Sequence, residues 1–136
     1  MLETIVIGSG PAGCSAAVYL KRFNYNVVVI SGAETALSSA HQIDNYYGFH
    51  NISGKELYQK GLEQLNELGI EVLNEVVTSI EYYGHFIVTT TTNTYEAKRV
   101  ILATGKARNK LKIKTICFIQ LQHLGYPTKF RLQKLF

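Results

Sequence analysis

Thr4-Ile5-Val6-Ile7-Gly8-Ser9-Gly10-Pro11-Ala12-Gly13 joins a short apolar strand to a Gly-x-Gly-x-x-Gly turn. The small residues that follow, Cys14-Ser15-Ala16-Ala17-Val18-Tyr19-Leu20, predict a helix directly after the turn. A strand, a glycine-rich turn and a helix in this order are typical of a dinucleotide-binding site. The alternative is a glycine-rich turn without a ligand, and the strand and helix around the motif favour the dinucleotide.

Each glycine of the motif has a physical role that requires the absence of a side chain. Gly8 permits the tight exit from the strand, Gly10 lets the backbone approach a pyrophosphate, and Gly13 lets the helix pack close to the sheet. Pro11 suits the first helical turn, where its missing N–H costs nothing. The free N–H groups and the dipole at the start of such a helix favour an anion.

The rest of the chain predicts further elements of a parallel sheet. The apolar run Val27-Val28-Val29-Ile30 is typical of a strand buried on both faces. Ser53 and Glu56 form a capping box at the start of a second helix, which Gly69 ends. The other predicted elements are a helix over 11–23, strands at 3–7, 70–73 and 100–103, a hairpin over 76–91 and a short strand from Tyr95.

A ribose-binding acid is expected at the end of the second strand. Ser31 holds that position, Gly32 follows, and Glu34 is the nearest acid. Glu34 either returns to the ribose through the turn at Gly32 or is a solvated loop carboxylate. These residue types leave the choice between NAD and FAD open.

Length and composition restrict the class of protein to which the chain can belong. A chain of 136 residues with 46% apolar residues makes one domain with a core. No apolar run approaches the roughly 20 residues of a membrane span, and no leader precedes the first strand. Cys14 and Cys117 have no metal or redox spacing and predict free thiols in the cytoplasm.

Charge divides the chain unevenly. Residues 1–96 hold 4 Lys or Arg and 10 Asp or Glu, whereas residues 97–136 hold 10 Lys or Arg and no acid. A basic segment can mark a nucleic-acid partner. Because these charges follow no helical pattern, we predict no nucleic acid and no membrane partner.

Residues 4–113 resemble the N-terminal FAD-binding part of the thioredoxin reductase family, which are class II pyridine nucleotide-disulfide oxidoreductases. Four pieces carry the resemblance in the family's order: Gly8-Ser9-Gly10-Pro11-Ala12-Gly13 with Ala16-Ala17-Val18-Tyr19; Ile43-Asp44-Asn45-Tyr46-Tyr47-Gly48-Phe49; Ile52-Ser53-Gly54-Lys55-Glu56-Leu57; and Tyr95-Glu96-Ala97-Lys98 with Val100-Ile101-Leu102-Ala103-Thr104-Gly105.

The resemblance implies FAD as the cofactor and an α/β fold, a Rossmann-like FAD-binding half-domain with a parallel sheet, two helices and an inserted β-hairpin or meander. It places Asn45 near the flavin end and Val77 near the adenine. The implied cofactor-binding residues are Gly8, Ser9, Gly10, Pro11, Ala12, Gly13, Ser31, Gly32, Glu34, Asn45, Val77, Ala103, Thr104 and Gly105. No catalytic residue and no metal ligand is predicted.

The sequence also departs from the family. Residues 33–40 lack its Gly-Gly-Gln segment, and neither Cys-x-x-Cys nor a second Gly-x-Gly-x-x-Gly occurs. We therefore expect an incomplete FAD/NAD(P)-binding domain over 1–113 and a non-family basic tail over 114–136, explained by a frameshift or gene truncation. We also expect an unpaired edge at the strand 100–103, covered in part by residues 115–121.

Three functions remain open at this point. The first is an FAD-binding part of a thioredoxin reductase-like NAD(P)H-dependent flavin oxidoreductase, catalytically incomplete alone. The second is a flavin- or nucleotide-binding subunit completed by a second chain; the expected partners are FAD and either such a chain or a second copy in a homodimer. The third is an inactive gene remnant.

Overall fold

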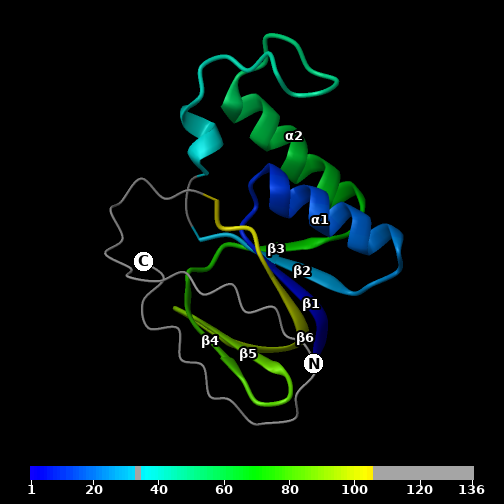
Figure 1. Cartoon of the computed structure of the whole chain (residues 1–136), viewed down its shortest axis with the longest axis vertical. Coiled ribbons are helices and arrows are strands. Elements are labelled where there is room, and N and C mark those ends of the chain that lie inside the picture. Colours follow the sequence, from blue (N-terminus) through cyan, green and yellow to red (C-terminus); the bar gives the residue numbers. More distant parts are fainter. Residues whose placement is uncertain (33–34, 106–136) are drawn as a thin grey trace.

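The computed structural model describes residues 1–32 and 35–105. One six-stranded sheet with the order β3-β2-β1-β6-β5-β4 forms the centre of the molecule (Figure 1). The elements are β1 (Leu2–Ile7), α1 (Pro11–Arg22), β2 (Val27–Ile30), η1 (Ala36–Ser39), α2 (Gly54–Glu67), β3 (Glu71–Leu73), β4 (Val77–Tyr82), β5 (Phe86–Thr90) and β6 (Thr94–Leu102).

The parallel half of the sheet has the predicted order. β1 pairs in parallel with β2 on one side and with β6 on the other, and β2 pairs in parallel with β3. All four residues of β2 are buried, as the continuous apolar run of Val27–Ile30 predicts. The glycine-rich strand is therefore central, and the α/β fold class is confirmed.

Helices α1 and α2 lie together on one face of this parallel half (Figure 1). Alternate strand residues point toward them, because successive side chains of a strand face opposite sides. Val6 and Val29 pack there against Ala17 of α1 and Leu65 of α2. The capping box predicted the start of α2 correctly: the Ser53 hydroxyl accepts a hydrogen bond from the Glu56 N–H at 3.1 Å.

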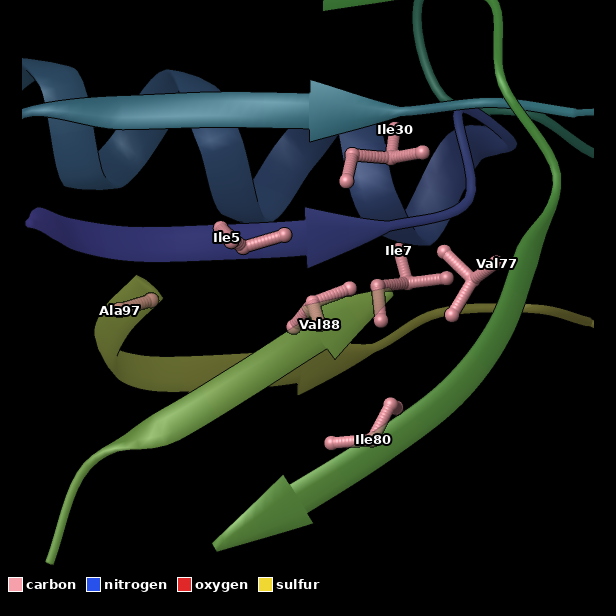
Figure 2. Close-up of a cluster of buried hydrophobic side chains, with 7 residues drawn as sticks. All are labelled: Ile5, Ile7, Ile30, Val77, Ile80, Val88 and Ala97. Carbon is pink, nitrogen blue, oxygen red and sulfur yellow. The ribbon is translucent and has the colours of Figure 1, made fainter. Parts of the chain in front are cut away.

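The antiparallel strands complete the core on the other side. Figure 2 shows side chains of β4 and β5 directed toward β1, with Val77 beside Ile7. The buried cluster consists of Ile5, Ile7, Ile30, Val77, Ile80, Val88 and Ala97. The hairpin thus belongs to the same sheet and buries the face that the helices leave free.

The C-terminal part of the sheet corrects one prediction. The short strand from Tyr95 and the strand at 100–103 are one continuous strand, β6, because it pairs with β1 and with β5. The polar residues between them predict a break, but only Ala97 among residues 96–99 faces the core. β5 pairs only with Thr94–Ala97 of β6, so among the described residues no strand pairs with residues 100–103 on the side away from β1, where the unpaired edge is predicted. Residues 115–121 lie outside the described residues.

The Glu75 carboxylate is hydrogen-bonded to residues at the open end of the β4–β5 hairpin. Glu75 accepts hydrogen bonds from the Thr90 hydroxyl at 2.5 Å and from the Asn93 amide and the Tyr95 hydroxyl, both at 2.8 Å. The bond from Thr90, followed by those from Tyr95 and Asn93, lowers the pKa of Glu75 against an opposing effect of desolvation. The cluster joins the segment before β4 to the turn between β5 and β6.

The lowered pKa of Glu75 predicts that the free energy of unfolding falls at acidic pH. The ionised Glu75 contributes stability above its unfolded pKa of about 4.3, and that contribution is lost as the pH falls through the lower folded value. The free energy of unfolding, measured by urea titration between pH 7 and pH 3, should therefore fall less in Glu75→Gln than in the parent chain. The control is Glu67→Gln, at an exposed carboxylate of α2. Equal pH slopes for parent and Glu75→Gln would contradict the assignment.

Candidate functional site

Four strand ends meet at one edge of the parallel sheet. The Gly8 N–H donates to the Ile30 carbonyl, the Ala103 N–H to the Ile7 carbonyl and the Ser31 N–H to the Leu73 carbonyl, each at 2.8 Å. The segments that leave β1, β2 and β6 therefore begin side by side. Ligands of open α/β sheets bind outside the carboxyl ends of the strands, where the sheet order reverses, and β1 is flanked here by β2 and β6.

The predicted packing roles of Gly8 and Gly13 are confirmed. Gly8 has a φ of +108°, and a Cβ there would lie 2.3 Å from the Ala103 carbonyl oxygen. A Cβ on Gly13 would lie 1.9 Å from the Gly8 carbonyl oxygen and 3.3 Å from the Ala103 Cβ. Both positions have no room for a side chain, because β1, β6 and the start of α1 are in direct contact.

Gly10 differs from both of its partners in the motif. Apart from its two chain neighbours, no described residue has an atom within 4 Å of the position that its Cβ would take, and its φ of −66° is open to any residue. Its glycine is therefore not required by the fold. Gly10 is also the N-cap of α1, where no side chain makes a capping hydrogen bond and the first turn has no acid. The start of α1 thus keeps free N–H groups beside an open space.

Ser9 connects the glycine-rich turn to two other elements. Its side chain is buried, and its hydroxyl lies 2.5 Å from the Ser31 hydroxyl and 2.8 Å from the Tyr58 hydroxyl of α2. Tyr58 is a site residue that the sequence analysis missed. Its position on α2, 49 residues from Ser9, gives no local signal.

The predicted residues after β2 and in β4 lie against each other. A Cβ on Gly32 would lie 2.5 Å from the Glu75 carbonyl oxygen and 2.7 Å from the Val76 Cα. The backbone before β4 therefore passes the carboxyl end of β2 at contact distance. The Val77 side chain itself is buried in the core, so only its backbone can meet a ligand.

The remaining predicted residues surround the turn. Ala12, Thr104 and Gly105 are exposed, and Gly105 has a φ of +68°. Asn45 is exposed in the loop before α2. Its neighbours line, with the turn and with α2, a cavity of about 440 Å³; the lining residues include Ser9, Pro11, Tyr46, Phe49 and Tyr58. Glu34 lies outside the described residues.

Cys14 is a packed thiol. It is buried, its Sγ–H donates to the Ser9 carbonyl at 3.0 Å, and burial raises the pKa of the thiol. A raised pKa keeps the thiol protonated and unreactive near neutral pH.

Residues 1–32 and 35–105 contain neither a candidate metal site nor a candidate membrane span. No group of three or more His, Cys, Asp or Glu residues there could hold a metal ion. None of the helices there is long and apolar enough to cross a membrane.

Residues 2–134 match the pyridine nucleotide-disulphide oxidoreductase family. The chain belongs to this family. Family members are FAD-binding flavoproteins, and the matched range covers the glycine-rich turn, both helices and all six strands.

Individual members of the pyridine nucleotide-disulphide oxidoreductases agree with this assignment. The thioredoxin reductase of Ureaplasma parvum is 36% identical over 116 residues, which are 82% of this chain and 37% of that protein. The crystal structure of the Streptococcus pyogenes thioredoxin reductase superposes with a TM-score of 0.76 at 39% identity and covers 83% of this chain and 38% of its own.

A third relative has ferredoxin and flavin in its name. The ferredoxin-flavin thioredoxin reductase of Clostridium acetobutylicum superposes with a TM-score of 0.73 at 37% identity, over 81% of this chain and 39% of its own. This chain therefore spans less than two fifths of the length of the thioredoxin reductases that it matches. Its fold is the Rossmann-like FAD-binding fold of those proteins.

Proposed function

We propose that this chain binds FAD, with the pyrophosphate against the Gly8–Gly13 turn and the first N–H groups of α1. The observation that carries the proposal is the open space at Gly10. The fold needs Gly8 and Gly13 for packing, whereas a glycine at position 10 serves only a molecule that must approach the backbone. The uncapped, acid-free start of α1 supplies donors for the negative charge of that molecule.

The other cofactor contacts follow from the strand ends. Ser31, Gly32 and the backbone at Val77 hold the adenosine half beside the carboxyl end of β2, where Glu34 is a further candidate. Ala103, Thr104 and Gly105 lie beside the turn on its other side and support the cofactor from β6. Asn45, in the loop that approaches the turn through Tyr46 and Phe49, contacts the flavin end.

We further propose that these residues are the flavin-binding part of a thioredoxin reductase-like NAD(P)H-dependent flavin oxidoreductase. When bound, FAD would supply two-electron transfer between a reduced donor and an oxidised acceptor. The described residues bind and orient the cofactor, and no reacting disulfide is among them. A second, different chain is the proposed source of the remaining parts, in the cytoplasm, and a homodimer is the alternative assembly.

Flavin content tests the proposal. The full chain, purified after expression and then incubated with FAD and desalted, should retain flavin with a visible absorbance band at about one FAD per chain. A folded chain that remains colourless after incubation would overturn FAD binding. Size-exclusion chromatography of the same sample separates a monomer, a homodimer and a complex with a second polypeptide.

A further inference from the structure

We propose that Tyr58 is a positioning residue of the cofactor site, which acts through Ser9 to present the Ser31 hydroxyl as a hydrogen-bond donor to the adenosine half of the ligand. The inference rests on the proposed function, because it assigns a role within the same site. It adds a residue of α2, from outside the glycine-rich turn, to the residues that determine affinity.

The three hydroxyls form a short chain across three elements. Ser9 is in the centre, 2.5 Å from Ser31 at the end of β2 and 2.8 Å from Tyr58 on α2. Ser9 is 1% exposed and Ser31 is 9% exposed, so water has little access to the two serine hydroxyls. Buried hydroxyls keep their hydrogen bonds because an unpaired one is costly.

The number of protons on the three hydroxyls restricts the directions of the two hydrogen bonds. Each hydroxyl has one proton, so Ser9 donates to one neighbour and accepts from the other. A phenol is a better donor than an aliphatic alcohol, because the aromatic ring withdraws electron density from its oxygen. Either oxygen of each pair can donate; with a ligand bound, Tyr58 donates to Ser9, and Ser9 donates to Ser31.

This direction leaves the Ser31 proton free. Within the described residues, the Ser31 hydroxyl has Ser9 as its side-chain partner, and that bond uses an acceptor site. The Ser31 proton is then available to an acceptor atom of a bound molecule at the end of β2. Dinucleotide sites usually place an acid there, which accepts from the ribose. This site presents a donor instead, which suits a ribose or phosphate oxygen.

Without the Tyr58 phenol, the direction of the hydrogen bond between Ser9 and Ser31 is no longer fixed. In Tyr58→Phe, Ser9 has no donor that faces it from α2, and the Ser31 hydroxyl is free to donate to Ser9. The donor to the ligand is then lost without any change in the turn or in β2. The effect falls on the adenosine half, so ADP alone reports it.

The experiment is a double-mutant cycle on the full chain, with ADP and FAD as the titrated ligands. We expect Tyr58→Phe to raise the Kd for both ligands by about 5-fold, the size of one net hydrogen bond. In a Ser9→Ala background the same substitution should change neither Kd, because Tyr58 acts through Ser9. Tyr19→Phe, at a tyrosine of α1 that is 66% exposed, is the matched control and should leave both values unchanged.

Each outcome decides between the possible roles. Tyr58→Phe that lowers only the melting temperature, with both Kd values equal to those of the control, would show a structural role and overturn the inference while FAD binding stands. An equal effect with and without Ser9 would also overturn it. A parent chain that binds neither ligand would overturn the proposed function and the inference together.

Discussion

The Gly13→Ala chain is expected to be about 3 kcal/mol less stable than the parent chain, the upper end for an added methyl group in a packed interior. The new Cβ would lie 1.9 Å from the Gly8 carbonyl oxygen, a backbone atom fixed by the hydrogen bond from the Gly8 N–H to Ile30. Relief requires α1 to move away from β1 and Ala103. Urea titration of the full chain measures the change in the free energy of unfolding.

A second glycine-to-alanine change is the matched control. Gly61 lies within α2, and a Cβ there would meet the Cys14 Sγ at 3.4 Å, an ordinary contact. Gly61→Ala should be neutral or stabilise by up to about 1 kcal/mol, because alanine is the better helix former. If Gly13→Ala were as stable as Gly61→Ala, the close contact between α1 and the end of β1 would be wrong.

The Gly10→Ala chain should keep its fold and lose its ligand. Its Cβ would project into open space, and the φ of −66° accepts alanine, so the loss of stability is limited to about 1 kcal/mol for a weaker N-cap. The same methyl group occupies the space through which the pyrophosphate must approach. We expect the Kd for FAD to rise roughly 10- to 100-fold, each tenfold step being about 1.4 kcal/mol.

Fluorescence titration of FAD and urea titration, made on the same sample, measure the two properties of Gly10→Ala. The expected pattern is a large change in affinity with a small change in stability. Unchanged affinity in a folded variant would show that the cofactor does not approach this part of the backbone, and the proposed pyrophosphate position would then be wrong.

Local chemistry made much of the fold predictable. Gly8 and Gly13 have the conformations and contacts that their spacing predicts, and Ser53 caps α2 as its spacing to Glu56 predicts. The limits of β2 match those of the apolar run Val27–Ile30. The contact of Gly13 with Gly8, the Ser53 cap and the limits of β2 depend on residues that are near in sequence, whereas the contacts of both glycines with Ala103 do not.

The remaining features depend on contacts between distant segments. The polar residues in the middle of β6 hide its continuity, which comes from pairing with β1 and β5. The hydrogen bond between Tyr58 and Ser9 joins residues 49 positions apart. The contact of Gly32 with Val76 depends on where the segment before β4 passes the end of β2. None of these contacts can be predicted from residues that are near one another in sequence.

The most direct test of the central claim is a backbone amide NMR titration of the isotope-labelled full chain with FAD. The account predicts the largest shifts at Ala12 and Gly13, whose N–H groups face the pyrophosphate, with further shifts at Ser31, Gly32 and Thr104. Saturable binding that leaves the amides of residues 8–13 unshifted, while those of other segments move, would contradict it.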